Sequence, residues 1–347
     1  MASKVVGVDI GSRSIRAVEV RNFASLTPIV TRMHEVALPA GAVRAGEVIE
    51  VGTVTAALRS LWSEAKFTTK DVAIGVSGSV VHPRDASFPK APMQRIRETL
   101  PFTVQDLIPL PVAEAIIDFY PASEEITEDG PVVRGILVAA SKDALKVMIT
   151  AVIGAKLNPI AVDLQPFGLV RALDRIGAAS GTTVIVEIGS STTSIIVTAG
   201  GVPQFVRSLQ IGDDDVTASL AKRLGVSPAQ AAQVKSTYGL LANRASAEER
   251  PVVEAVYASS WDLLVGIRDT LSYYSAARAG ATLDRLILLG DGASTPGLDQ
   301  LVGDATRIPV QRPDFLAVGT LAKGVSQPSG LLELFVAPLG LAMGAVA

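Results

Sequence analysis

Two short acidic turns carry the residue types that bind a nucleotide phosphate. The first is Val6–Ser14 (VGVDIGSRS), and the second is Val184–Thr192 (VIVEIGSST), with Glu187 lying 178 positions after Asp9. In each copy an apolar run precedes an acid, then Ile-Gly-Ser, then hydroxyl residues. Glycine lets the backbone approach a phosphate closely, and successive turn N–H groups and hydroxyls can donate to its oxygens. The repeat therefore predicts a nucleotide held between two similar halves of the protein.

This interpretation assigns a role to each turn residue. Asp9 and Glu187 would hold a hydrated Mg²⁺ ion, because hard cations prefer oxygen ligands. The alternative for a single turn is a plain hairpin whose acid caps the turn's own N–H groups, but two copies in register favour the phosphate site. The residues expected to bind phosphate are Gly11, Ser12, Arg13 and Ser14 in the first turn, and Gly189, Ser190, Ser191, Thr192 and Thr193 in the second.

The elements around the turns read as strand–turn–strand twice, since β-prone sequence follows each turn. Residues 1–38 predict three strands, 51–66 a helix, 71–78 a buried strand, and 93 to about 108 a second helix. Thr182 is expected to open a second lobe. In that lobe Ser227-Pro228-Ala229-Gln230 predicts a helix start, with Ser as the N-cap and Gln at N3. Further helices are expected over 213–224 and 248–279, and a core strand over 283–289.

Composition excludes several classes of protein. The chain has 347 residues, of which 48% are hydrophobic and 19% charged, so it can build real cores. The formal net charge of -3 gives no sign of nucleic-acid binding, which a basic patch would accompany. The absence of cysteine excludes disulfides and cysteine-ligated zinc, and two histidines argue against a histidine-rich metal site.

Two segments allow a structural and a functional interpretation. The uncharged stretch 335–347 is shorter than the roughly 20 residues that span a bilayer. Its Gly340 and Gly344 favour a closely packed buried helix over a membrane anchor. Asp213, Asp214 and Asp215 look like a metal cluster, but consecutive acids do not share a helix face. The electrostatics of a helix start is the better interpretation.

Several longer motifs give the chain a family resemblance. A late strand followed by Gly290-Asp291-Gly292-Ala293 accompanies the paired turns, and the whole resembles the actin-like ATPase superfamily. The passages Phe88–Met93 (FPKAPM), Asp106–Pro111 (DLIPLP) and Asp118-Phe119 are similar to the extra subdomain of the PilM family of type IV pilus assembly proteins, relatives of the division protein FtsA. Val162–Phe167 (VDLQPF) and Val234–Gly239 (VKSTYG) resemble further landmarks of that family, and so does the C-terminal helix.

The resemblance implies an α/β, actin-like two-lobed fold of paired ribonuclease-H-like domains with an FtsA-like inserted subdomain. The implied divisions are the core of lobe I (1–83), the inserted subdomain (84–158), a return helix (159–181), the core of lobe II (182–211), its helical subdomain (212–282), a core with the adenine loop (283–323) and a C-terminal helix on lobe I (324–347).

Further site residues follow from the resemblance. Gly290, Asp291, Gly292 and Ala293 would form the adenine loop. Arg16 stands where relatives commonly have lysine. Lys235 could reach ribose or adenine, or could be a solvated helix lysine. Gln165 occupies a position where the superfamily often orients the attacking water, although a polar residue at a helix start is at least as good an interpretation.

Besides Arg16, three positions depart from the family pattern. Glu187 replaces a common aspartate, Asp291 replaces a glycine, and Ala232 stands where active relatives often carry glutamate. Despite these departures the chain is expected to bind ATP, and the departures predict at most slow hydrolysis.

The implied function is that of an ATP-binding cytoplasmic scaffold at the inner face of the cell membrane, in a type IV pilus assembly machine. Its partner would be the N-terminal cytoplasmic tail of a PilN-like membrane protein, with Leu107, Ile108 and Pro109 as a candidate wall of the groove. Other pilus platform components and a homo-oligomeric ring are further expected contacts, and membrane association would be indirect. A small-molecule kinase of the same superfamily is the alternative, but no carboxylate base stands out. An FtsA-like membrane tether is a second alternative, although the linker it needs is missing.

Overall fold

A computed structural model describes residues 4–24, 28–241, 246–278, 281–314, 320–322, 325 and 332–345. The chain divides into two compact units. The first comprises residues 1–181, 196–208 and 314–347, and the second comprises 182–195 and 209–313. Thr182, where the sequence predicts a second lobe, is the first residue of the second unit. The finer divisions expected from the sequence stay predictions.

The first unit is built on a six-stranded sheet with the strand order β10-β6-β1-β2-β3-β16. Strands β1, β2 and β3 form the expected antiparallel meander, while β6 and β10 run parallel to β1. The strands are β1 (Lys4–Ile10), β2 (Ser14–Arg21), β3 (Ile29–Ala37), β6 (Asp71–Val76), β10 (Asn158–Leu164) and β16 (Thr320–Leu321). Helices α1 (Val51–Ala65) and α3 (Lys142–Gly154) pack against this sheet and share its hydrophobic core. Because β1, β6 and β10 are parallel, their carboxyl ends meet at one edge.

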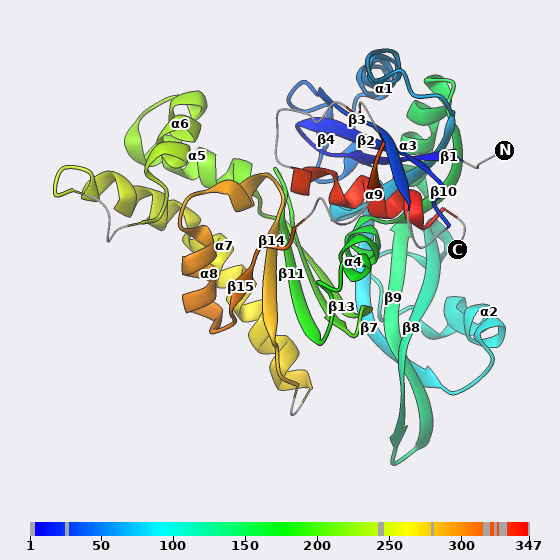
Figure 1. Ribbon diagram of the computed structural model, residues 1–347. Helices are drawn as coiled ribbons and strands as arrows, with labels where there is room; N and C mark the ends of the chain where they lie inside the picture. Colours follow the sequence, from blue (N-terminus) through cyan, green and yellow to red (C-terminus); the bar gives the residue numbers. More distant parts are fainter. Residues whose placement is uncertain are drawn as a thin grey trace. The chain divides into compact units, whose positions relative to one another are not determined.

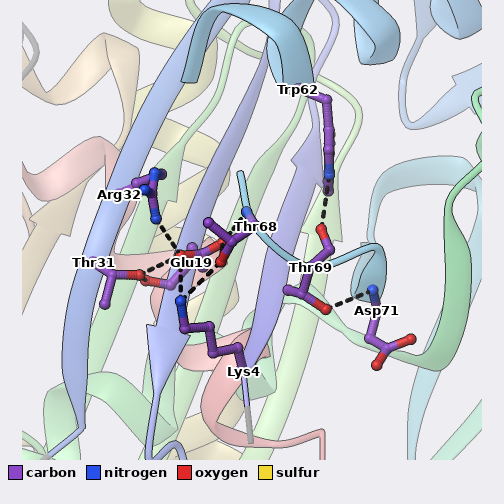
Figure 2. A network of polar contacts seen from close by, with 8 residues as sticks. All are labelled: Lys4, Glu19, Thr31, Arg32, Trp62, Thr68, Thr69 and Asp71. Carbon is purple, nitrogen blue, oxygen red and sulfur yellow. Dashed lines mark hydrogen bonds and ion pairs between the residues drawn. The ribbon is translucent and has the colours of Figure 1, made fainter. Parts of the chain in front are cut away.

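A buried carboxylate on β2 links β1, β3 and the loop that precedes β6 (Figure 2). Glu19 of β2 is fully buried and accepts hydrogen bonds from Thr31 Oγ1 at 2.6 Å and Arg32 Nη1 at 2.8 Å. The backbone N–H and hydroxyl of Thr68 donate to its other oxygen at 2.5 Å and 2.8 Å. Burial raises the pKa of Glu19, but these hydrogen bonds outweigh it and leave the pKa below its ordinary value. Glu19 is therefore ionised in the folded protein at neutral pH.

An inserted three-stranded sheet of order β7-β9-β8 has its own core and helix (Figure 1). Its strands are β7 (Val81–Pro89), β8 (Ala115–Thr127) and β9 (Gly130–Ser141), and its helix is α2 (Met93–Thr103). The sequence predicts this helix as far as Ile108, but it ends at Thr103, two residues after the internal Pro101. In this core the rings of Phe88 and Phe119 pack edge to face, with their centroids 4.9 Å apart.

The C-terminal helix α9 (Val336–Met343) is buried along its whole length. It packs on β1, β2, β6 and on α4 (Gln165–Arg175) within the first unit (Figure 1). Backbone contact needs glycine here, because a Cβ on Gly340 would lie 1.8 Å from the Gly168 carbonyl oxygen, and a Cβ on Gly7 would lie 1.8 Å from that of Pro338. This outcome favours the buried-helix interpretation. Within the described ranges, none of the helices combines the length and apolarity needed to cross a membrane.

A second, five-stranded sheet has the order β13-β12-β11-β14-β15, with β11, β14 and β15 parallel. Its strands are β11 (Thr182–Ile188), β12 (Thr193–Ala199), β13 (Val202–Leu209), β14 (Arg285–Leu289) and β15 (Val310–Gln311). The helices of the second unit are α5 (Asp213–Leu224), α6 (Pro228–Tyr238), α7 (Arg250–Ala277) and α8 (Leu298–Thr306). The expected capping box at Ser227 is confirmed, since Ser227 and Gln230 exchange their side-chain and backbone hydrogen bonds.

Candidate functional site

The two acidic turns have the same backbone geometry. The N–H of Gly11 donates to the Ser14 carbonyl oxygen at 3.0 Å, and that of Gly189 donates to the Thr192 carbonyl oxygen at 2.9 Å. A Cβ on Gly11 would lie 3.2 Å from the Ser14 oxygen, and a Cβ on Gly189 would lie 3.1 Å from the Thr192 oxygen. Both glycines have ordinary negative-φ backbone, so close approach and not a left-handed conformation favours glycine. The predicted repeat is confirmed as a repeat of structure.

In the first unit the turn lies at the carboxyl edge of the sheet. Asp9 is half-buried near the end of β1 and stands opposite Arg16 on β2. Arg16 in turn donates from Nε to Glu35 of β3 at 2.9 Å and is only 13% exposed. The guanidinium thus has a carboxylate partner within the sheet, a contact that the sequence does not predict. Ser14 is buried, Ser12 half-buried and Arg13 exposed.

Gln165 stands at the same sheet edge, as the first residue of α4 directly after β10. Its side chain is 2% exposed, and its Oε1 is buried without a hydrogen-bond partner in the described part of the chain. It lies against β6, since a Cβ on Gly75 would meet the Gln165 Cβ at 3.2 Å. A buried amide oxygen without a partner is costly, so a ligand or water that donates to it would be favoured.

In the second unit the start of α5 closes on the second turn. The N–H groups of Asp213 and Asp214 donate to the Gly189 and Ser190 carbonyl oxygens at 2.9 Å and 2.8 Å. Gly212 allows this approach, because a Cβ there would lie 2.5 Å from the Ser190 oxygen. Glu187 is half-buried on β11 just before the turn. Ser191 is half-buried beside it, and Thr193 is buried and donates to the Ile211 carbonyl oxygen at 2.8 Å.

The loop Gly290–Ser294 also lies against this turn. The Ser190 hydroxyl donates to Asp291 Oδ2 at 3.1 Å. Gly290 has φ +88°, and a Cβ on it would lie 2.5 Å from the Ile188 carbonyl oxygen. Asp291 itself begins a short 3₁₀ turn that includes Gly292 and Ala293, both buried. The aspartate that departs from the family pattern therefore fits here, because Gly290 carries the positive φ and Ser190 binds the carboxylate.

Lys235 is buried within the second unit, so the solvated-lysine alternative is wrong. Its side chain is 7% exposed and forms an ion pair with Asp213. It also donates to Thr217 Oγ1 at 2.7 Å, which joins α6 to α5. Asp213 in turn starts α5, next to the second turn. Lys235 is thus linked to the second turn through Asp213. A direct contact between Lys235 and a nucleotide stays a prediction.

The Asp213–Asp215 run is a helix start, as expected. All three acids lie in the first turn of α5, and Asp215 Oδ2 accepts from the Gly212 N–H at 2.8 Å. Negative charge at a helix N-terminus is stabilising. Across the residues that the structure describes, no group of three or more acidic or histidine side chains is arranged to hold a metal ion.

The candidate groove wall is only partly at the surface. Leu107 is 45% exposed and Pro109 is exposed, but Ile108 is 7% exposed and belongs to the core of the inserted subdomain. Ile108 is therefore corrected to a core residue. Because α2 ends at Thr103, the chain turns before Ile108 and points it inward.

Two edge strands offer exposed apolar side chains that sequence reasoning missed. β10 ends the large sheet and exposes Ile160 (45%) and Val162 (41%), while β8 ends the inserted sheet and exposes Ile116 (51%). Tyr120 of β8 packs its ring on that of Phe167 in α4, the helix that follows β10, with the ring centroids 4.8 Å apart. The pKa of Tyr120 is raised, mainly by burial. The charge of Arg171 lowers it in part, and that of Asp163 on β10 raises it further.

The comparisons with known proteins agree with this architecture. The family of type IV pilus assembly protein PilM matches residues 7–345. A chain of a PilM–PilN type IV pilus biogenesis complex is similar at a TM-score of 0.85 and 23% identity, with 100% of both chains covered. The ethanolamine utilization protein EutJ from Carboxydothermus hydrogenoformans is similar at 0.60 and 15%, with 99% of this chain and 90% of EutJ covered.

MreB5 of Spiroplasma citri, solved with ADP, is similar at a TM-score of 0.53 and 11% identity, with 97% of this chain and 94% of MreB5 covered. These likenesses show that the fold is actin-like, as the resemblance implies. The family match extends over nearly the whole sequence. The chain therefore belongs to the PilM family of type IV pilus assembly proteins.

Proposed function

We propose that this chain is an ATP-binding scaffold of a type IV pilus assembly machine. The observation that carries ATP binding is the matched geometry of the two turns, in which Gly11 and Gly189 make the same hydrogen bond 178 positions apart. In the proposal the turn N–H groups and hydroxyls of both turns bind the phosphates. Gly290–Ala293 and Lys235 contribute on the adenosine side. MreB5, which shares the fold, was solved with ADP.

The donor set also suits Mg²⁺. Asp9 and Glu187 are half-buried carboxylates at equivalent strand ends, and hard cations prefer such oxygen ligands. Both would hold the ion through water, and the ion would neutralise phosphate charge.

Gln165 would accept a hydrogen bond from water through its buried Oε1 and so orient that water. The longer Glu187 and the small Ala232 are suited to slow turnover.

The proposed partner is the N-terminal cytoplasmic tail of a PilN-like membrane protein, and the relative in the PilM–PilN complex supports this choice. An extended tail can add to an open sheet edge and place alternate side chains in apolar contact. β10 fits this mode, because Ile160 and Val162 are exposed on alternate positions of an edge strand. Leu107 and Pro109 remain candidate contacts. The scaffold would thereby lie at the inner face of the membrane, next to other platform components, with a homo-oligomeric ring as a further possible assembly.

A pull-down with the synthetic tail tests the partner. Changing Ile160 and Val162 together to Ala should weaken tail binding at least tenfold and leave the melting temperature unchanged. Ile126→Ala is the matched control, since Ile126 is 90% exposed and lies near the carboxyl end of β8 in the inserted sheet, not on β10. Tail binding that survives the double change would place the tail elsewhere. The kinase alternative is not favoured, because the family match over residues 7–345 and the similar chain of the PilM–PilN complex both support pilus assembly.

A further inference from the structure

The first unit has an exposed basic surface at the sheet edge opposite the acidic turn. We propose that this surface binds an anionic lipid membrane. The strands β1, β6 and β10 begin here, whereas Asp9 and Gln165 stand at their other ends. The basic edge is defined by five residues: Lys4, Arg59, Lys66, Lys70 and Lys156.

Hydrogen bonds bring the five cations together. Lys4 Nζ donates to Thr68 Oγ1 at 2.8 Å, which places it against the 66–70 loop (Figure 2). The Asn158 N–H donates to the Lys70 carbonyl oxygen at 2.8 Å, two residues after Lys156. Arg59 Nη2 donates to the Gly154 carbonyl oxygen at 2.5 Å, two residues before Lys156. The ends of two helices and three strands therefore share one charged surface.

Two of the lysines occupy backbone positions that normally take glycine. Lys66 follows α1 with φ 55°, and Lys156 follows α3 with φ 63°. A residue in this left-handed conformation after a helix is usually glycine, and other side chains adopt it at a cost. Each lysine also suits the negative end of its helix dipole. That local role does not account for Lys70, which lies outside both helices and is exposed.

The acidic groups on the same segments are already bound. Glu19 is fully buried and forms ion pairs with Arg32 at 2.8 Å and Lys4 at 3.8 Å, and Asp71 accepts from Asn158 Nδ2 at 2.7 Å. Glu64 of α1 accepts from Ser60 at 2.5 Å and lies 3.0 Å from His34. Because the five cations outnumber these three acids, the basic edge carries excess positive charge, although the whole chain has a formal net charge of -3.

The shape of the surface favours a membrane over an acidic peptide. Four of the five cations lie at or next to the ends of helices and strands, and Arg59 lies within α1. This spread suits a planar anionic surface, whereas a peptide needs a linear track. Ile153 of α3 is 57% exposed beside Gly154 and offers an apolar contact to the headgroup region. Each lysine near an anionic bilayer strengthens binding about fivefold, so several together are needed. The surface is separate from the turns and does not rest on the proposed function.

The test is sedimentation of the full chain with vesicles of phosphatidylcholine containing about 30% phosphatidylglycerol, beside pure phosphatidylcholine vesicles. We expect binding to the anionic vesicles alone and its loss when salt rises from 50 to 500 mM, since exposed charges are screened. The variant combines Lys66→Asn, Lys70→Gln and Lys156→Asn, because asparagine tolerates positive φ. Three lost charges should weaken binding about 100-fold.

The control variant removes three exposed charges elsewhere, through Arg95→Gln, Lys222→Gln and Arg250→Gln, and should bind as the unchanged chain does. Thermal melts establish that both variants fold. Equal binding to both vesicle types, or equal loss in the control variant, would overturn the proposal. So would binding of a poly-glutamate peptide without binding of vesicles, which would assign the surface to an acidic protein segment instead.

Discussion

Gly340 of α9 touches the backbone of Gly168 of α4, so that a Cβ on Gly340 would fall 1.8 Å from the Gly168 carbonyl oxygen. Arg171 of α4 also contacts α9, because its Nη1 donates to the Gly340 carbonyl oxygen at 2.5 Å. Its Nη2 donates to Asp163 Oδ2 at 2.6 Å. The C-terminal helix is thereby fixed to the helix that begins with Gln165. Two glycines make this contact possible, and neither helix can retreat without losing buried apolar area.

Gly340→Ala should therefore destabilise the protein by about 3 kcal/mol, because the new methyl group meets backbone that cannot move aside. Gly52→Ala is the control, since a Cβ on Gly52 meets nothing within 4 Å in helix α1. Alanine there should be neutral or stabilising by less than about 1 kcal/mol. Urea unfolding of both variants measures the difference, and equal stabilities would show that α9 is not packed as described.

Glu19 should make the stability depend on pH in the acid range. Its folded pKa lies below the ordinary value of 4.5, so the stability it contributes is fully present above about 4.5. That contribution is lost as the pH falls through the lower folded pKa. Glu19→Gln should cost about 2 kcal/mol at pH 7, because the new amide NH₂ group cannot accept the hydrogen bonds that Arg32 or Thr68 donates to one carboxylate oxygen.

Unfolding curves at pH 7 and pH 3 test this sign. The gap in unfolding free energy between the unchanged chain and Glu19→Gln should shrink at pH 3. If this difference in unfolding free energy instead grew as the pH fell, the result would contradict the lowered pKa of Glu19. Glu64→Gln serves as a comparison with an exposed acid. Hydrogen bonds from Ser60 and His34 also lower the pKa of Glu64, so its free-energy gap should change with the same sign.

Leu107 and Ile108 should respond differently to truncation, although they are neighbours. Ile108→Ala should lower stability by about 2 to 4 kcal/mol, because it empties space in the core of the inserted subdomain. Leu107→Ala should leave the melting temperature within experimental error, since Leu107 is 45% exposed. If Leu107 contacts the PilN-like tail, its truncation should also weaken that complex. Similar melting losses for both variants would refute the assignment of only one of them to the core.

ATP hydrolysis should be slow, below about 1 per second. Nothing in the described part of the chain donates to the buried Oε1 of Gln165, which is suited to orient water. Glu187 and Ala232, however, depart from the pattern of active relatives. A phosphate-release assay with and without Mg²⁺ measures the turnover. Fast Mg²⁺-dependent turnover that disappears in Gln165→Ala would show that the site is a competent ATPase.

Local features of the fold follow from the sequence, and long-range ones do not. The two turns and the Ser227–Gln230 capping box depend on neighbouring residues, so their residue types suffice to predict them. β10 escaped prediction because Asn158-Pro159 reads as a turn, and its pairing with β6 depends on residues about 87 positions away.

The site shows the same limit. Arg16 reaches Glu35, and Lys235 reaches Asp213 and Thr217, only after strands and helices from separate stretches pack together. The sequence identifies these cations as candidates for a nucleotide but cannot show which carboxylates they meet. Ile108 was misplaced for a simpler reason, because α2 stops at Thr103 and turns the following residues around.

Equilibrium titration with a fluorescent ATP analogue tests the central claim most directly. Gly11→Val and Gly189→Val should each weaken binding at least 100-fold, because a larger side chain occupies the space where the turn approaches phosphate. Asp9→Ala should act in the same direction, and Gly52→Ala should bind as the unchanged chain does. Melting curves establish that each variant is folded. The account predicts loss of binding from either turn alone, and unchanged affinity in both valine variants would contradict it.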